Sequence, residues 1–324
     1  MASLPGFRVV VLVSFSVFLT VVLGFGLPAL LNAAMRLLGL PETSVTECIV
    51  GLYLAFVACV AMPRIPRGCV KDKGGEGAKE LEEMHSDRMR VLQLDVCSDE
   101  QVAQAVDHIR GCLDEPEKGL WAVVNNAGVS TFGEVEFTPI DTYRQVYEVN
   151  LIGTIRVTKA VLPLIRRAKG RVVNIASMYG RMGNIMRSPY CVSKYGVEVF
   201  SDCLRYEMKT WGVKVSVIEP GNFIVATGIL TRDIVADTSN KLWAGAPSVV
   251  KEDYGMAHFE QQMALMRSYC NSGQKDMAPV LGDITDAITS KRPYTRYMPM
   301  EPHWWIRVQL MTYLPSAISD FLYF

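Results

Sequence analysis

Three side chains near the middle of the sequence, Ser177, Tyr190 and Lys194, have the types and spacing for acid-base chemistry. The four-residue spacing of Tyr190 and Lys194 puts both on one face of a helix. A free phenol has a pKa near 10, and an ammonium held about 4 Å away lowers that pKa toward neutrality. A neighbouring hydroxyl can polarise a carbonyl oxygen. The group therefore predicts interconversion of an alcohol and a ketone, with a cofactor carrying the hydride.

The surrounding pattern predicts the elements that position these side chains. Residues 172–175 form a β-branched run without charges and predict a short buried strand. Ser177 would then lie just past the strand's end, where open α/β sheets present reactive groups. Ser188 and Pro189 predict the start of a helix, with the serine as cap and the proline at its first position. A Tyr-x3-Lys pair alone is common on solvated helix faces, so its context decides its meaning.

Strands alternate with helices between residues 89 and 218, which predicts a parallel, doubly wound α/β sheet. The predicted strands are residues 89–96, 120–124, 172–175 and 213–218, and the predicted helices include residues 99–113 and 138–168. Ligands bind such sheets at the carboxyl ends of the strands. Those ends hold Asp95, the turn Asn125-Asn126-Ala127-Gly128, Ser177 and Pro220-Gly221. Their joint placement predicts one site.

In this order Asp95, Asn125-Asn126-Ala127-Gly128, Asn150, Ser177, Tyr190-x3-Lys194 and Pro220-Gly221 resemble the short-chain dehydrogenase/reductase pattern. The resemblance implies a Rossmann-type enzyme that passes a hydride between NAD and a carbinol carbon. Tyr190 would be the acid/base, Lys194 would lower its pKa and hold the nicotinamide ribose, Ser177 would orient the carbonyl, and Asn150 would fix a water. Asp95 would meet the adenine, and Asn125, Asn126, Ala127, Gly128, Pro220 and Gly221 would line the cofactor.

Longer phrases from about Gly68 onward, such as SPYCVSKYGVEVFSDCLRYEM, are similar to the 3-hydroxybutyrate dehydrogenase branch of this family. That resemblance implies conversion of D-3-hydroxybutyrate to acetoacetate at the mitochondrial inner membrane, in contact with phospholipid, and it leaves a homo-oligomer open. Retinol and 17-beta-hydroxysteroid dehydrogenases are similar too. They leave a lipid-like alcohol as the alternative substrate and the endoplasmic reticulum as the alternative location.

The substrate alternatives need different surroundings for Tyr190. A hydroxy acid needs a cation for its carboxylate, and the sequence offers Arg181, Arg187, Lys241 and Lys251 without ranking them. A retinoid or steroid needs an apolar cavity instead.

The first 66 residues predict a membrane-anchoring region before a dehydrogenase domain at residues 67–324. Residues 9–31 carry no charge and are long enough to span a bilayer, while the apolar run 48–62 is shorter and fits a short span or an interfacial helix. A cleaved signal peptide is the alternative for the first run. Basic residues follow residue 62 and predict that the domain stays on the cytosolic or matrix side. Residues 248–324 would face substrate or lipid.

The sequence departs from the family at the start of the domain. The family begins with a strand and a T-G-x-x-x-G-x-G turn whose backbone N–H groups bind the pyrophosphate. Here on the order of 40 residues, a β-α unit and most of the next strand, are missing before Cys69. The loss should expose edges of a parallel sheet. A hypothesis of another class is therefore a catalytically inactive, membrane-tethered chain that associates with longer subunits.

Composition excludes several other functions. The chain has 33 basic and 33 acidic residues and no basic stripe, which argues against nucleic-acid binding. Its eight cysteines lack a C-x-x-C motif and are interpreted as free thiols in a reducing compartment. Its four histidines are far apart, so no metal site is expected.

Overall fold

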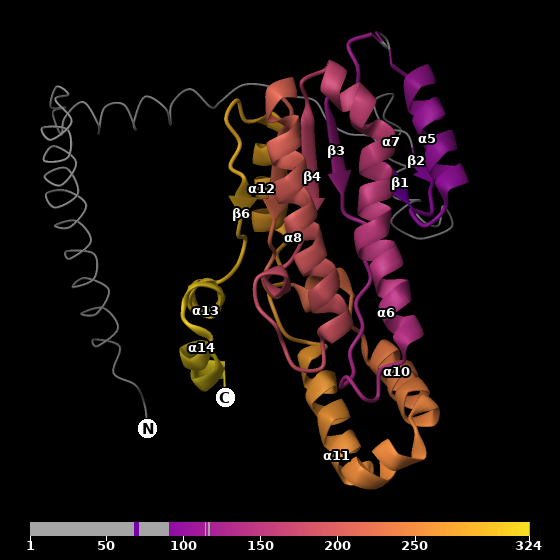
Figure 1. The fold of residues 1–324 in the computed structure, drawn as a ribbon, viewed down its shortest axis with the longest axis vertical. Helices are drawn as coiled ribbons and strands as arrows, with labels where there is room; N and C mark the ends of the chain where they lie inside the picture. Colours follow the sequence, from indigo (N-terminus) through magenta and orange to yellow (C-terminus); the bar gives the residue numbers. More distant parts are fainter. Residues whose placement is uncertain (1–67, 71–90, 114, 116, 324) are drawn as a thin grey trace, which may run out of the picture. The chain divides into compact units, whose positions relative to one another are not determined.

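The computed structural model describes residues 68–70, 91–113, 115 and 117–323 (Figure 1). The predicted apolar segments 9–31 and 48–62 and the boundary after residue 66 lie outside these residues. Within the described residues, no helix is both long and apolar enough to cross a membrane.

The described strands form two parallel sheets. One has four strands in the order β3 (Ala122–Asn125), β4 (Arg171–Ile175), β5 (Lys214–Ile218) and β6 (Arg296–Tyr297). The other pairs β1 (Gly68–Val70) with β2 (Val91–Gln93). No described strand pairs with the edge of β3 that faces away from β4. The predicted parallel α/β sheet is confirmed. The described strands form two sheets, and the sequence lacks a β-α unit of the family pattern before Cys69.

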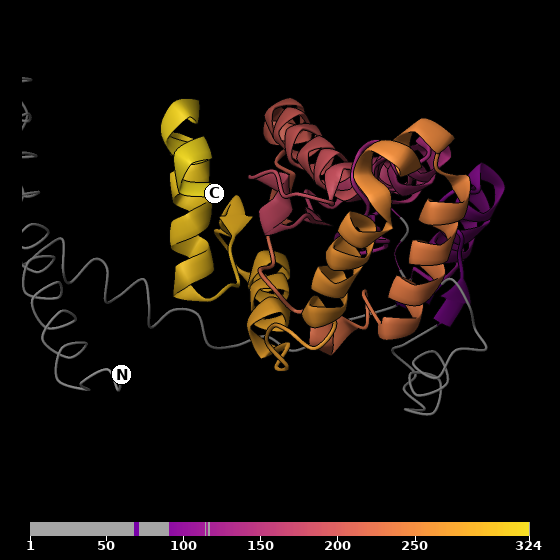
Figure 2. The same cartoon turned by 90° about the horizontal axis from the view of Figure 1, so that it is seen from below.

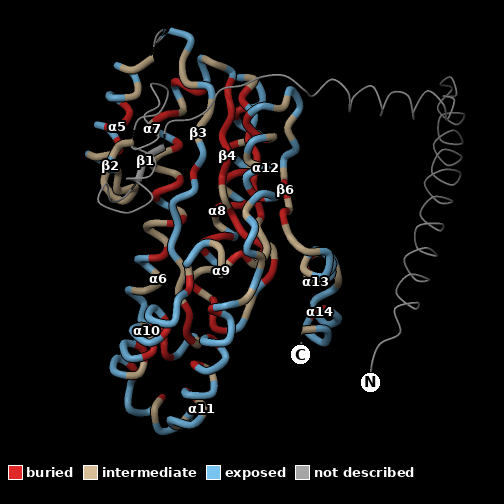
Figure 3. Tube along the Cα trace, turned by 180° about the vertical axis from the view of Figure 1, so that it is seen from behind, coloured by how far each residue is buried: buried red, intermediate tan, exposed pale blue. Residues whose placement is uncertain are grey.

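The central strands are buried because helices cover both faces of the larger sheet. On one face Val172 and Val215 pack with residues of α7 (Thr154–Arg167) and α8 (Ser188–Met208). On the other face Val173 and Ile218 pack with α12 (Ala278–Thr289). Neighbouring valines of β4 thus enter opposite layers, as the two-residue period of a strand requires. Figure 3 shows this buried strip running along β4.

The helix predicted over residues 138–168 is continuous but changes its pitch. It consists of α6 (Ile140–Tyr147), a π-helical turn (Glu148–Gly153) and α7. Gly153 permits close packing there, because a Cβ on it would lie 2.7 Å from Cγ2 of Val96. π-turns inside α-helices are frequent at functional sites, and this one contains Asn150. The predicted helix at residues 99–113 is α5 (Asp99–Gly111).

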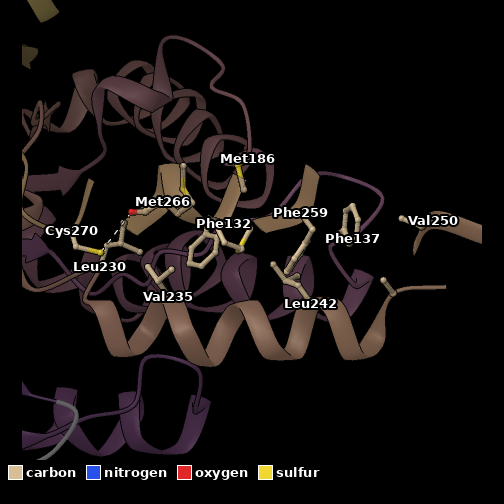
Figure 4. Close-up of a cluster of buried hydrophobic side chains, with 12 residues drawn as sticks. Phe132, Phe137, Met186, Leu230, Val235, Leu242, Val250, Phe259, Met266 and Cys270 are labelled. Carbon is tan, nitrogen blue, oxygen red and sulfur yellow. Dashed lines mark hydrogen bonds between the residues drawn. The ribbon is translucent and has the colours of Figure 1, made fainter. Parts of the chain in front are cut away.

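The remaining helices lie beyond the carboxyl end of the larger sheet. They are α9 (Ile224–Thr227), α10 (Arg232–Gly245), α11 (Ser248–Tyr269), α13 (Pro302–Tyr313) and α14 (Ser316–Tyr323) (Figures 1 and 2). Helices α10 and α11 contribute to an apolar cluster that includes Phe132 and Phe137. In this cluster aromatic rings pack with aliphatic and sulfur-containing side chains (Figure 4). The helix α11 bends at Gly255, whose φ of 73° lies outside the helical region.

Candidate active site

Ser177 lies at the carboxyl end of β4, as its sequence position predicted. Backbone bonds tie this end to β5, since Ala176 N–H donates to the Ile218 carbonyl and Met178 N–H donates to the Pro220 carbonyl. The Ser177 hydroxyl accepts the N–H of Tyr179 at 3.2 Å and caps a short 3-10 turn. Parallel strand ends therefore hold Ser177 beside the Pro220-Gly221 loop.

Helix α8 carries Tyr190 and Lys194 on one face. It begins at Ser188 with Pro189 in its first turn, close to the prediction. The predicted cap is wrong, however. Arg187 occupies the cap position without a side-chain cap bond, and the Ser188 hydroxyl lies 2.6 Å from the Tyr143 hydroxyl. A tertiary hydrogen bond to α6 has replaced the local one.

Lys194 is buried directly behind the strand that carries Ser177. Its Nζ donates to the Ile175 carbonyl at 2.8 Å and lies 5.7 Å from the ring centre of Tyr190. Burial lowers the pKa of Lys194 to about 8, and the nearby charge of Glu198 opposes this shift. The ammonium is thus held by a backbone carbonyl at the end of β4.

Burial raises the pKa of Tyr190, and the Ser177 side chain and the positive charge of Arg187 partly lower it. The lowering of this pKa by Lys194 stays a prediction, and the Lys194 ammonium donates to the Ile175 carbonyl.

Asn150 joins the π-turn to the loop that follows β3. Its side-chain Nδ2 donates to the Val129 carbonyl at 2.9 Å and to the Ser193 hydroxyl at 3.0 Å, and its Oδ1 accepts the Val129 N–H at 2.8 Å. It is 1% exposed. The side chain thus positions the loop and α8 rather than facing an open site.

Asn125, expected to line the cofactor, belongs to a buried polar chain instead. Its Nδ2 donates to Thr158 at 2.9 Å and to the Asn174 Oδ1 at 2.8 Å, and Asn174 donates to Ser201 at 2.8 Å. These bonds connect β3, β4, α7 and α8. The Asn125 side chain thus joins a strand to its neighbour and to a helix, and its contact with the cofactor stays a prediction. Asn126, Ala127 and Gly128, in contrast, are exposed beyond the strand end.

Two glycines of the predicted site allow close approach of other groups. A Cβ on Gly128 would lie 3.5 Å from Asn150 Oδ1 and 3.7 Å from Lys194 Nζ, so this exposed backbone borders the ammonium. A Cβ on Gly221 would lie 2.6 Å from the Cβ of Met300, and Gly221 N–H donates to the Pro299 carbonyl. Gly128 faces the candidate site, whereas Gly221 serves packing.

Asp95 follows the separate two-stranded sheet. Its carboxylate accepts the N–H of Cys97 at 3.0 Å within a turn before α5. Arg156 of α7 bridges the two parts of the domain, since it donates to the Val96 carbonyl at 2.7 Å and to Glu148 at 2.8 Å. Asp95 therefore directly precedes a residue, Val96, that α7 holds through Arg156.

The described residues fit one end of a nicotinamide dinucleotide. Lys194, Ser177 and Tyr190 meet beside the exposed backbone at Gly128, which suits a ribose and its attached ring. The pyrophosphate end has no counterpart among them, because no described glycine-rich turn joins a strand to a helix beside the open edge of β3. The fit therefore covers the reactive end of the cofactor only.

The four cations proposed for a substrate carboxylate lie in different places. Arg187 is buried and donates to Ser130 at 3.1 Å, and its charge reaches Tyr190. Arg181 pairs with Glu219 at 3.4 Å. Lys241 is exposed on α10, and Lys251 of α11 lies 3.4 Å from the Ala244 carbonyl. Of these four cations, Arg187 is the one whose charge lowers the pKa of Tyr190.

Sequence reasoning missed a buried charged cluster formed by Glu198, Glu219 and Arg296. Glu198 stands one helical turn after Lys194, and Glu219 directly precedes Pro220. The available signal was a glutamate in an otherwise apolar strand end, together with a second one on the buried face of α8.

Comparisons with known proteins agree with this geometry. A family model described as short chain dehydrogenase matches residues 68–233. The chain is 60% identical over 273 residues to a mitochondrial D-beta-hydroxybutyrate dehydrogenase of Bos taurus, covering 84% of this chain and 76% of the relative. It is 57% identical over 271 residues to the protein of that name in Mus musculus, with the same coverage.

More distant similarities extend to other substrates and to solved structures. The chain is 37% identical over 260 residues to 17-beta-hydroxysteroid dehydrogenase type 6 of Bos taurus, covering 80% of this chain and 79% of the relative. A crystal structure of a short-chain dehydrogenase from Streptomyces avermitilis matches with a TM-score of 0.55 and 22% identity, over 75% of this chain and 81% of that one. This last likeness supports the fold.

Proposed function

Because the chain belongs to the short chain dehydrogenase family, we propose that it passes a hydride between NAD and a secondary alcohol, with D-3-hydroxybutyrate and acetoacetate as the pair. The observation that carries the substrate is the difference in identity, 60% to the bovine hydroxybutyrate enzyme against 37% to the bovine steroid enzyme. Enzymes of one family that differ this much usually differ in substrate. NAD rather than NADP rests on the same resemblance.

In this proposal the nicotinamide supplies or accepts the hydride when it is bound. Tyr190 donates its phenolic proton to the carbonyl oxygen during reduction and takes it back during oxidation. Ser177 donates a hydrogen bond to the same oxygen and orients it. Lys194 holds the ribose and, as the nearest ammonium, stabilises the phenolate that forms. Asn150 binds both the loop at Val129 and Ser193 of α8, and so fixes the position of that loop relative to the helix that carries Tyr190 and Lys194.

Arg187 is the proposed partner of the substrate carboxylate. It is the cation whose charge already acts on Tyr190, and a guanidinium binds a carboxylate through two parallel hydrogen bonds. The apolar cluster beside it is filled by its own side chains, including Met186, Phe132 and Phe259 (Figure 4). A small charged substrate suits this setting better than a retinoid or a steroid does.

A membrane surface is the proposed partner of the C-terminal helices. The large apolar side chains that α13 and α14 leave exposed are Trp305, Ile306, Leu310, Tyr313, Ile318, Phe321 and Leu322. Exposed tryptophan, tyrosine and aliphatic side chains suit the headgroup region of phospholipids. The hydroxybutyrate relatives are named as mitochondrial proteins, so a mitochondrial membrane is the proposed location.

A second copy of the chain is a further proposed partner. Along α8 the apolar side chains of Val192, Tyr195 and Val199 are 49%, 42% and 61% exposed, and they recur at helical spacing. An apolar stripe of this kind on an otherwise packed helix suits a symmetric helix-helix interface.

The experiment that tests the proposal is an NADH titration of the purified full chain, followed by an assay with D-3-hydroxybutyrate and, separately, retinol. Saturable binding with activity on the hydroxy acid supports the proposal, and Tyr190→Phe should then reduce kcat by about 10²- to 10⁴-fold while NADH still binds. Activity on retinol alone would favour the lipid-like substrate.

The competing hypothesis is a chain that folds without catalysing. One observation favours it, since the described residues hold no pyrophosphate-binding turn. A folded sample that binds no NADH at millimolar concentration would establish this hypothesis and overturn the proposed activity. The catalytic side chains would then be retained on a sheet that cannot hold the cofactor.

A further inference from the structure

Two glutamates that the proposed reaction does not use lie buried behind Lys194. Glu198 is on α8, one turn after Lys194, and Glu219 directly follows β5. The Glu219 side chain has no exposed surface and that of Glu198 is 6% exposed. Buried carboxylates are costly unless cations and hydrogen bonds compensate them.

Arginines compensate one oxygen of each glutamate. Arg296 Nε lies 3.3 Å from Glu198 Oε2 and 3.1 Å from Glu219 Oε1, and Arg181 Nη1 lies 3.4 Å from the same Glu219 oxygen. Arg296 also binds Asp202 through its Nη2 at 2.8 Å. Two negative side chains thus share one guanidinium nitrogen.

The second carboxylate oxygen of each glutamate indicates that the pair carries a proton. Glu198 Oε1 and Glu219 Oε2 are both buried, and neither has a nitrogen or hydroxyl donor among the described residues. The two carboxylates are held near each other, because the remaining oxygen of each lies beside the same Arg296 Nε. Ionised carboxylates only accept hydrogen bonds, so a proton on one of them supplies the donor that this buried pair lacks.

Several charged groups surround the pair. From α8 come Lys194, Asp202 and Arg205, from β6 comes Arg296, and from the segment after Ser177 comes Arg181, which also binds the Tyr313 hydroxyl of α13. Burial and the charge of Glu219 raise the pKa of Glu198 to about 8, against the opposing effect of both arginines. Burial raises the pKa of Glu219 as well.

We propose that Glu198 and Glu219 share one proton at neutral pH and act as positioning residues that lock α8 to the end of β5. The lock joins the two parts of the candidate site. Glu219 precedes Pro220, whose carbonyl accepts the Met178 N–H next to Ser177. Gly180 lets that loop lie on Glu198, because a Cβ there would be 3.1 Å from the Glu198 Cγ. Lys194 and Ser177 are thereby held in fixed register.

The stability of glutamine variants tests the shared proton independently of activity. Glutamine has the shape of a protonated glutamate and donates through its amide, so Glu198→Gln and Glu219→Gln should each shift the melting temperature at pH 7 only slightly. The double variant removes the remaining negative charge from the buried arginines and should lose far more than the sum of the single losses. Large, additive losses in the two single variants would overturn the proposal.

The pH dependence of unfolding supplies the second readout. A pKa raised on folding gives stability that is complete below the ordinary glutamate pKa and is lost as pH rises toward about 8. The unfolding equilibrium constant of the parent should therefore rise by about tenfold per pH unit relative to Glu198→Gln between these limits. Asp202→Asn, which breaks an ion pair of the same arginine, should destabilise the chain but keep this slope. A slope that persists in Glu198→Gln would overturn the proposal.

The positioning role has its own readouts, the first of which rests on the proposed function. When the pair loses its proton at high pH, its new charge favours the ammonium of Lys194. The alkaline limb of kcat/KM should therefore lie at lower pH in Glu198→Gln than in the parent, and an unchanged limb would overturn the role in positioning. If the chain has no activity, infrared spectroscopy tests the shared proton instead, through the band of a protonated carboxylic acid. That band should be present in the parent and lost in Glu198→Gln or in Glu219→Gln. Its absence from the parent would overturn the shared proton.

Discussion

Lys194 shows, at the scale of one residue, how a side chain that the proposed reaction needs reduces stability. Its pKa of about 8, below the ordinary value of 10.5, reflects an ammonium held in the interior at a cost of about 3 kcal/mol. The hydrogen bond to Ile175 returns only about 1 kcal/mol of this. The residue that the proposed reaction needs is therefore a net burden on the fold.

We expect Lys194→Met to abolish dehydrogenase activity and to raise stability at pH 7 by about 1 to 2 kcal/mol. The sign follows from proton binding. Between pH 8 and 10.5 the unfolded chain binds the lysine proton more strongly than the folded chain, so parent stability rises with pH across this window. Thermal unfolding at pH 7 and pH 10 measures the effect. A variant less stable than the parent at both pH values would contradict the buried ammonium.

Arg187 gives a second prediction at this scale. Removal of a guanidinium that binds a carboxylate costs about 1.5 to 3 kcal/mol, so Arg187→Met should raise KM for the hydroxy acid by about 10- to 100-fold. It should also move the Tyr190-dependent limb of the pH profile upward, because the Arg187 charge lowers the pKa of Tyr190. The exposed Lys241→Met is the matched control. An unchanged KM for Arg187→Met would exclude this carboxylate site.

Sequence spacing predicted which of the candidate side chains lie on common elements but not the pKa shifts that their surroundings cause. The spacing of Tyr190 and Lys194 and the place of Ser177 follow from helix and sheet periods, which act locally. The pKa of Tyr190 depends on burial and on Arg187, and Asn125 faces Asn174 across two strands. Such tertiary contacts have no fixed spacing in the sequence.

The π-turn is the element that connects the two halves of the site. Asn150 satisfies both backbone groups of Val129 and the Ser193 hydroxyl, so truncation removes three hydrogen bonds, of which the one to Ser193 is buried. Asn150→Ala should cost about 2 to 3 kcal/mol and lower the melting temperature by about 5 to 10 °C. Calorimetry checks this, with Asn240→Ala on the exposed side of α10 as control. Equal melting temperatures for both variants would show that water replaces the side chain.

The elements themselves were largely predictable from the sequence. The parallel strands and the helix over residues 138–168 follow from hydrophobic periodicity and turn residues. Three features were not predictable. The wider turn at Asn150, the cap role of Arg187 and the bend at Gly255 depend on side chains that meet across elements or on a single positive φ.

At the scale of the whole domain, the strands that the structure describes form two sheets, with the division between β2 and β3. The described residues leave one edge of β3 unpaired, whereas β4 and β5 are paired on both sides. Alternate backbone N–H groups of β3 should therefore exchange with solvent much faster than those of β4. Hydrogen exchange followed by NMR measures this at single residues. Equal protection of β3 and β4 would show that another strand covers this edge in solution.

The open edge also has an optical consequence, because Trp121 stands at the start of β3. Its indole N–H donates to the Ile288 carbonyl at 3.0 Å, the guanidinium of Arg171 lies 4.8 Å from its ring, and half of its surface is exposed. Indole emission shifts to shorter wavelength when the ring loses water. The difference in emission between the parent and Trp121→Phe is the spectrum of Trp121. A shift of this spectrum to shorter wavelength would therefore report a strand, lipid or partner that covers the open edge of β3.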